Sequence, residues 1–194
     1  MKSIFIDCET TGLRPGQSGV LQIAGFIEIN TKLVETFDMK CRPFPDDKVE
    51  EQALIVNGLS KEEIDEYPSP LDTYRKFIHL LRRYVDPYKK EDKFLWFGYN
   101  APFDMDHLRA WFTKNEDTYF GSYFFFPPID VMTIAAYMLQ EERPRFKNFK
   151  LATVAEYLNI TIEEGELHTA LYDIKLTKKV LEELERRAME KNVK

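Results

Sequence analysis

Apolar residues near the N-terminus follow the pattern of a buried β-strand. The run Ile4-Phe5-Ile6 contains β-branched and aromatic residues, and Asp7 and Glu9 follow closely after it. Because side chains alternate along a strand, Asp7 and Glu9 point to one face and Cys8 points to the other. Two neighbouring carboxylates in a buried setting are costly unless they are paired or bind a cation, whereas at an exposed strand end they need no partner. This stretch alone leaves both interpretations open.

The next two apolar stretches predict further strands. Residues 20–30 and 33–41 are rich in strand-forming residues, and a short turn, Asn30-Thr31-Lys32, separates them. We therefore expect the first three strands to form an antiparallel meander.

The rest of the chain alternates helices with strands after a loop-rich segment, 43–70. That segment contains a turn dipeptide, Asn57-Gly58, and a capping box that opens a short helix at Ser60. Strands are expected at 94–97 and at 123–126, the latter stopped by Pro127-Pro128, and helices at 71–85, after Asp104, and at 130–140, 151–158 and 169–187.

This order of elements predicts an α/β fold. Three antiparallel strands come first, and strands alternating with helices follow, which favours a mixed five-stranded sheet with helices on both faces. The length of 194 residues, with 44% hydrophobic and 31% charged residues, is typical of one globular domain. We expect a single domain spanning residues 1–194.

Charge and cysteine usage narrow the class of protein. The net charge of −6 argues against a nucleic-acid binder held by a broad basic surface, but not against an enzyme that grips a few nucleotides through metal ions. Cys8 and Cys41 both fall in predicted strands, so we expect reduced, buried thiols. The N-terminus lacks the layout of a secretory signal, and no apolar run reaches the ~20 residues of a membrane span. We therefore expect a cytoplasmic protein.

Two more carboxylates stand at notable positions. Asp104 follows the predicted strand 94–97 where a helix begins, so it is either an ordinary helix N-cap or part of a site at the strand end. Asp173 lies on a face of the last helix that is otherwise small or apolar, with Ala170, Thr177, Val180, Leu181 and Leu184. A carboxylate on a face that packs against a sheet needs a partner or a metal ion.

These carboxylates and His168 suit one kind of chemistry. Two Mg²⁺ or Mn²⁺ ions about 4 Å apart can drive in-line phosphodiester displacement, and they need oxygen ligands such as these four side chains. His168 falls in an expected loop, where it is either simply exposed or able to take a proton from an attacking water. A zinc site is not favoured, because the chain has three histidines and no cysteine pair with ligand spacing.

Three short motifs give the sequence a resemblance to a known family. The motifs are Asp7-x-Glu9-Thr10-Thr11-Gly12, Asn100-x-x-Phe103-Asp104 and His168-x-Ala170-x-x-Asp173. In content and order they resemble the exonuclease motifs of the DnaQ-like (DEDDh) 3′→5′ exonucleases, a family that includes the proofreading epsilon subunit of DNA polymerase III and ribonuclease T. The resemblance spans residues 7–173 and implies a ribonuclease-H-like fold.

The resemblance also implies a role for each matching residue. Two divalent metal ions, Mg²⁺ or Mn²⁺, would be held by Asp7, Glu9, Asp104 and Asp173. His168 would be the general base that completes the catalytic set. The 3′-terminal nucleotide would contact Thr10, Thr11, Gly12, Leu13, Asn100 and Phe103. As an apolar residue at a helix start, Phe103 is equally compatible with a core position.

Two positions depart from the usual family pattern. Asn57 stands where the family's Val-His-Gly-Ile-Thr stretch has histidine, and Tyr99 stands where a histidine often precedes the motif asparagine. Neither position is an implied metal ligand, so both departures concern substrate fit.

One basic stretch interleaves cations with aromatic residues. Residues 143–150 read Arg-Pro-Arg-Phe-Lys-Asn-Phe-Lys. The pattern fits either a surface that tracks phosphates and stacks a base, or a solvated loop before the next helix.

We therefore expect a metal-dependent 3′→5′ exonuclease that acts on single-stranded nucleic acid, with DNA favoured, and releases nucleoside 5′-monophosphates. The alternative is a non-catalytic or proofreading-associated subunit of a polymerase or RNA-processing complex. The chain ends soon after the last helix, which tilts the expectation toward a free-standing nuclease. A polymerase partner stays open, as does the choice between a monomer and a homodimer.

Overall fold

The computed structural model describes residues 1–163 and 169–191, and a mixed five-stranded sheet lies at its centre. The spatial order of the strands is β3-β2-β1-β4-β5. Strand β1 pairs antiparallel with β2 and parallel with β4, so it is the central strand of the sheet. The predicted fold class is confirmed. The strands are β1 (Lys2–Thr10), β2 (Val20–Ile29), β3 (Lys32–Lys40), β4 (Leu95–Gly98) and β5 (Ile129–Asp130).

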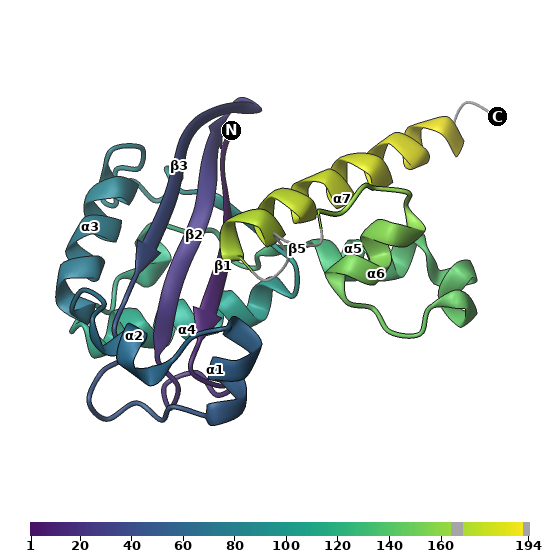
Figure 1. Ribbon diagram of the computed structural model, residues 1–194. Helices are drawn as coiled ribbons and strands as arrows, with labels where there is room; N and C mark the ends of the chain where they lie inside the picture. The colour runs from purple at the N-terminus through teal and green to yellow at the C-terminus, as the bar shows by residue number, and fades with distance from the viewer. Residues whose placement is uncertain (164–168, 192–194) are drawn as a thin grey trace.

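Helices cover both faces of this sheet (Figure 1). One face packs against α3 and α4. The other packs mainly against α7, which crosses β1 and β2 and continues past the sheet, where α5 and α6 pack against it (Figure 1). The helices are α1 (Glu51–Asn57), α2 (Lys61–Asp65), α3 (Pro70–Arg82), α4 (Ala101–Lys114), α5 (Val131–Met138), α6 (Leu151–Tyr157) and α7 (Ala170–Lys191), with short 3₁₀ turns η1 (Phe120–Ser122) and η2 (Gln140–Arg145).

Strand β1 feeds both hydrophobic cores, as its alternation predicted. Ile6 and Cys8 belong to the core beneath α3 and α4, whereas Phe5 belongs to the core beneath α5, α6 and α7. Phe5 stacks between Phe26 and Phe97, with ring centroids 4.6 and 4.7 Å away. Asp7 and Glu9 therefore share the face of the sheet that α7 covers.

The fifth strand differs from its prediction. Residues 123–126 do not form a strand, because Tyr123 and Phe124 are buried in an aromatic cluster while Phe125 and Phe126 are exposed. Phe124 makes only an isolated bridge to Phe94. Regular pairing with β4 resumes after the two prolines, at β5, since proline has no N–H to donate to a ladder.

The sequence analysis did not predict helix α1. The dipeptide Asn57-Gly58 was interpreted as a turn in a loop, but Gly58 (φ 64°) ends α1 in the left-handed conformation. The same residues serve both purposes, because a helix C-cap and a tight turn each favour a residue that adopts positive φ. The capping box at the start of α2 is confirmed: Ser60 N–H donates to Glu63 Oε2 (2.7 Å), and Glu63 N–H donates to Ser60 Oγ (3.2 Å).

The two cysteines are buried and free, as expected from their strand positions. In the described ranges 1–163 and 169–191, no helix combines the length and apolar character needed to cross a membrane.

Close pairing between β1 and β2 predicts the effect of a substitution at Gly25. A Cβ there would lie 1.9 Å from the Phe5 carbonyl oxygen, so Gly25→Ala forces the two strands apart and lowers the free energy of unfolding by about 3 kcal/mol. Gly121→Ala is the matched control, because no atom lies within 4 Å of its added Cβ. Urea denaturation measures both variants, and equal stability losses would contradict this packing.

Candidate active site

Asp7 and Glu9 lie at the carboxyl end of the central strand. Both side chains are half-buried, and they share one face of β1. The pairing of β1 with β2 shifts register between Glu9 and Thr10, so the regular strand ends directly after the two acids. The end of the central strand therefore carries two carboxylates on the face of the sheet that α7 covers.

Asp104 reaches the same strand end from α4. Its carboxylate is buried, with 3% of the residue exposed, and Oδ1 accepts a hydrogen bond from the Cys8 backbone N–H at 3.0 Å. The N-cap of α4 is Asn100, so the alternative interpretation of Asp104 as a helix cap is wrong. The bond to Cys8 N–H fixes the start of α4 against β1 between Asp7 and Glu9.

Asp173 approaches from the other side of the sheet, in the first turn of α7. The side chain is half-buried, whereas Ala170, Thr177 and Val180 on the same helix are completely or almost completely buried. Helix α7 packs against β1 and β2, and Glu28 of β2 forms an ion pair with Lys178. The packing confirms that the predicted apolar face of the last helix, which carries Asp173, lies over the sheet.

These acids raise one another's pKa. Burial raises the pKa of Asp7 well above its usual value, and the charges of Asp104, Glu9 and Asp173 raise it further. Burial and the charge of Asp173 raise the pKa of Glu9 to about 7. Burial also raises the pKa of Asp104, although the Cys8 N–H opposes this shift. The structure therefore brings all four predicted carboxylates into one electrostatic environment.

The donor atoms of these four side chains suit a divalent cation. All four side chains offer carboxylate oxygens, which are the hard donors that Mg²⁺ and Mn²⁺ prefer. Within residues 1–163 and 169–191, no three histidine, cysteine, aspartate or glutamate side chains already meet in a metal-holding arrangement. Without a cation, these like-charged side chains repel one another and stay apart. To bind a shared ion, their carboxylate groups would have to turn toward it. The predicted general base, His168, lies outside the described residues.

A cavity of about 370 Å³ opens beside Glu9. Thr10, Gly12, Leu13 and Phe103 line it, so four of the six predicted nucleotide contacts meet at one place. Leu13 is 76% exposed, so its side chain lies outside the core and is accessible to a ligand. The ring of Phe103 is half-buried and packs on the His107 ring, with centroids 4.3 Å apart.

Two predicted contacts lie elsewhere. Thr11 is completely buried, and its hydroxyl donates to the Lys48 carbonyl (2.6 Å) and accepts from the Gly19 N–H (2.7 Å). Asn100 is exposed in the left-handed region (φ 62°) and does not line the cavity. Thr11 therefore supports the wall of the cavity from behind.

The sequence analysis missed one wall of this cavity. The missing wall is α1 with the residue before it, which contributes Glu50, Gln52, Ala53, Val56 and Asn57. Asn57 Nδ2 donates to the Thr10 carbonyl (3.1 Å), and Glu50 N–H donates to the Thr11 carbonyl (2.8 Å). Asn57, at the position where the family resemblance leads one to expect histidine, thus ties α1 to the end of β1. Recognition of Gly58 as a helix cap would have revealed this wall.

Asp130 was also missed. Its Oδ1 accepts from the backbone N–H groups of Asn100 (2.8 Å), Ala101 (3.2 Å) and Met132 (3.2 Å). One carboxylate therefore caps α5 and also fixes the turn that leads into α4. The sequence signal was its position as the N-cap of the helix at 131–138, which was interpreted only as a helix start.

The basic stretch 143–150 directs its rings inward. Phe146 and Phe149 are half-buried, and Phe146 packs on Phe149 and Tyr157 at centroid distances of 5.1 and 4.6 Å. The Phe149 carbonyl accepts a hydrogen bond from Tyr99 Oη (2.7 Å). These contacts occupy the two rings within the protein and leave them less available to stack a base, while the basic side chains remain at the surface.

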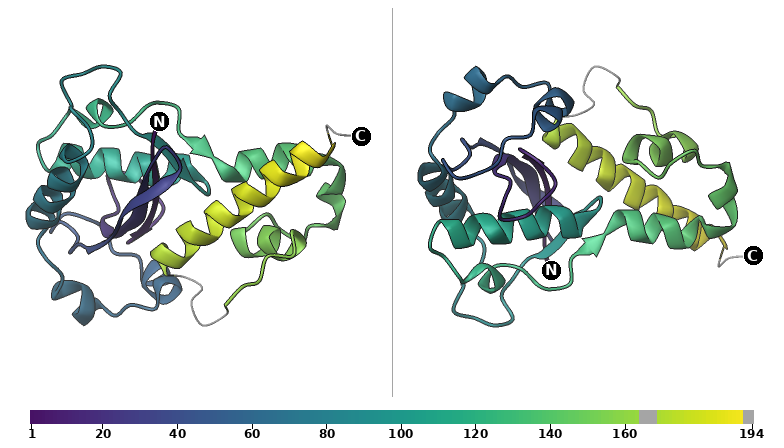
Figure 2. Two further views of the ribbon diagram at one scale, coloured as in Figure 1. Left: turned by 90° about the horizontal axis from the view of Figure 1, so that it is seen from above. Right: turned by 90° about the horizontal axis from the view of Figure 1, so that it is seen from below.

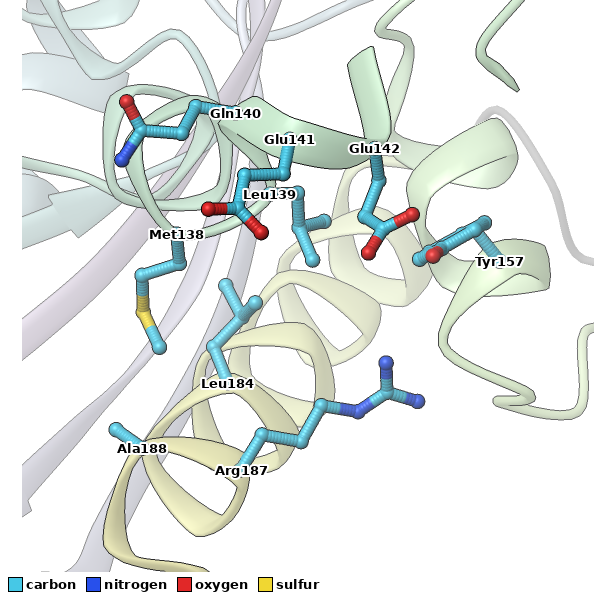
Figure 3. A pocket seen from close by; sticks show the side chains of 9 residues that line it. All are labelled: Met138, Leu139, Gln140, Glu141, Glu142, Tyr157, Leu184, Arg187 and Ala188. Atoms are coloured by element: carbon cyan, nitrogen blue, oxygen red, sulfur yellow. The ribbon is translucent and has the colours of Figure 1, made fainter. Parts of the chain in front are cut away.

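A smaller cavity of about 220 Å³ lies away from the strand ends, where η2 and α6 meet α7 (Figure 3). Figure 3 shows Glu141 and Glu142 on one side of it and Arg187 on the other. Arg187 donates to Glu183 (2.8 Å) and to the Leu158 carbonyl (3.2 Å), which ties α7 to α6. None of the predicted site residues lines this cavity.

Solved structures of Escherichia coli exonuclease I have a similar fold. A zinc-bound complex of that enzyme with single-stranded DNA matches with a TM-score of 0.76 at 20% identity, covering 96% of this chain and 40% of the other. Its complex with a dA16 oligonucleotide matches with a TM-score of 0.72 at 20% identity, covering 95% and 41%.

Curated relatives and a family profile agree with this fold. The PolC-type DNA polymerases III of Oceanobacillus iheyensis and Bacillus subtilis are 22% and 23% identical over 98% of this chain, which spans 12% of each polymerase. Residues 4–181 match the sequence profile of the family described as "Exonuclease". The chain therefore belongs to this exonuclease family, as its DnaQ-like motifs predicted.

Proposed function

We propose that this chain removes nucleotides from the 3′ end of single-stranded nucleic acid, DNA in the first instance, and releases nucleoside 5′-monophosphates. The observation that carries the proposal is a group of mutually repelling carboxylates beside a cavity of about 370 Å³. Membership of the exonuclease family supports the reaction class. The exonuclease I structures with bound oligonucleotides support single-stranded DNA as the substrate class.

Asp7, Glu9, Asp104 and Asp173 would hold two divalent ions, Mg²⁺ or Mn²⁺. Such ions, when bound, stabilise the attacking and leaving oxygens of a phosphodiester displacement. The Cys8 N–H holds Asp104 in place through its hydrogen bond, so this carboxylate is oriented before an ion arrives. Bound ions would lower the pKa values of Asp7 and Glu9, because a nearby cation offsets the burial and the like charge that raise them.

The remaining residues would position the nucleotide and the water. Thr10, Gly12 and Leu13 would seat the terminal nucleotide, with Leu13 and Phe103 on either side of the base or sugar. Helix α1 would close the cavity. Asn57 and Asp130 are positioning residues, since each holds a backbone segment of the site. His168 would accept the proton of the attacking water, a role that suits a side chain with a pKa near neutrality.

Replacement of Asp7 tests the catalytic role of the carboxylates. Asp7→Asn removes one oxygen ligand and one negative charge, and we expect the rate of release from a 3′-labelled oligonucleotide with Mn²⁺ to fall by at least about 100-fold. Folding should not suffer, because the substitution relieves repulsion among Asp7, Glu9 and Asp173. The assay separates products on a denaturing gel, using the full chain.

Asp106→Asn is the matched control for this experiment. Asp106 is an exposed carboxylate on α4, two residues after Asp104, so its loss should leave the rate within about twofold of the wild type. Equal rates for the wild type and Asp7→Asn, or no mononucleotide release by either, would contradict the proposed function.

Replacement of Leu13 tests the nucleotide seat. Leu13→Ala removes an apolar contact made in both the bound and the transition state, so KM should rise about tenfold while kcat changes little. Because Leu13 is 76% exposed, the melting temperature should hardly change. Leu33→Ala, at a 61% exposed leucine on β3, is the control. An unchanged KM for Leu13→Ala would show that Leu13 does not contact the bound nucleotide.

A further inference from the structure

A second hollow of about 450 Å³ flanks α4 and is lined by basic and aromatic residues. The basic side chains are Lys90, Lys93 and Arg109, and the aromatic ones include Phe120, Phe125 and Phe126. The segment that follows α4 runs back alongside this helix toward β5 (Figure 2). Residues of this segment line one wall of the hollow. None of these residues belongs to the proposed catalytic set.

The charge of this hollow is opposite to that of the chain as a whole. The net charge is −6, yet no acidic residue lines the hollow. Among the described residues, Lys90, Lys93 and Arg109 form no salt bridge. Three cations without acidic partners on an acidic protein favour a polyanionic ligand.

The aromatic side chains are available to a ligand. Phe126 is 75% exposed and Phe125 is 36% exposed, which leaves two apolar rings at the surface. The Arg109 guanidinium lies over the rings of Phe120 and Phe126, at 5.3 and 5.7 Å from their centroids. Exposed rings next to cations are the combination that binds single strands, because bases stack on rings while cations contact phosphates.

Helix α4 connects the hollow to the proposed metal site. Met105, which follows Asp104 directly, lines the hollow and is buried. Arg109 comes five residues after Asp104, roughly 7.5 Å further along the helix axis at 1.5 Å per residue. One helix thus carries a metal-site carboxylate toward β1 and a basic residue toward the hollow.

We propose that this hollow binds the single-stranded nucleic acid upstream of its 3′ end, with a base stacked on Phe126 and phosphates near Arg109, Lys90 and Lys93. The proposal rests on the proposed function, because it places the 3′ end of the same strand at Asp7, Glu9 and Asp104. It predicts that a long strand binds more tightly than a dinucleotide, since only the long strand reaches both places.

The test compares oligonucleotide lengths in the full chain. The Asp7→Asn background slows hydrolysis enough for an equilibrium measurement, and fluorescence anisotropy with Mn²⁺ measures binding of 5′-fluorescein dT12 and dT2. Adding Arg109→Ala or Phe126→Ala should weaken dT12 binding by about five- to tenfold and leave dT2 binding unchanged. Arg109→Ala should also reduce the slope of log K against log salt by about 0.7, the value for one phosphate contact on a single strand.

The controls remove one arginine and one exposed aromatic ring away from the hollow. Arg75→Ala removes an exposed arginine from α3, and Tyr137→Ala removes a 73% exposed ring from α5. Both should bind dT12 as the parent does. Equal dT12 affinities for the hollow variants and these controls would overturn the proposal.

Failure of the two proposals can be told apart. The dinucleotide pTpT reports on the chemical step, because it does not reach the hollow. If the wild type releases no mononucleotide from pTpT or dT12, the proposed function fails. If it cleaves both, and if Arg109→Ala and Phe126→Ala bind and cleave dT12 as the controls do, only the second binding surface fails.

Discussion

Four carboxylates share one electrostatic environment at the end of the central strand, and this constraint shapes the rest of the fold. Strand β1 supplies Asp7 and Glu9, α4 supplies Asp104, and α7 supplies Asp173, so three elements far apart in sequence must meet there. Their burial and like charge raise the pKa values of Asp7, Glu9 and Asp104. The two hydrophobic cores, one on each face of the sheet, hold these elements together against that repulsion.

The sequence predicted the features that depend on local periodicity. The alternation along β1 placed Cys8 and the acids on opposite faces, and the exception in the apolar face of the last helix marked Asp173. Family motifs then connected these positions with Asp104. The structure confirms the sheet and brings the four acids together, while their roles as ligands, and that of His168, stay predictions.

The features that the sequence did not predict depend on tertiary context. Asn57-Gly58 is the end of a helix that walls the nucleotide cavity, although the same dipeptide is common in turns. The aromatic run 123–126 has strand propensity, but two of its rings are drawn into the aromatic core, which leaves Phe125 and Phe126 exposed. The base-stacking role considered for 143–150 is better suited to this exposed pair, since Phe146 and Phe149 pack inward.

The most direct test of the carboxylate site is the pH dependence of metal stabilisation. Folding raises the pKa of Glu9 from its usual 4.5 to about 7, so without metal the folded state loses stability as the pH rises between these values. Cations replace the bound protons, so Mn²⁺ should raise the melting temperature more at pH 8 than at pH 5, and Asp104→Asn should reduce that difference. Equal shifts at both pH values, or no shift at pH 8, would contradict a metal site built from these carboxylates.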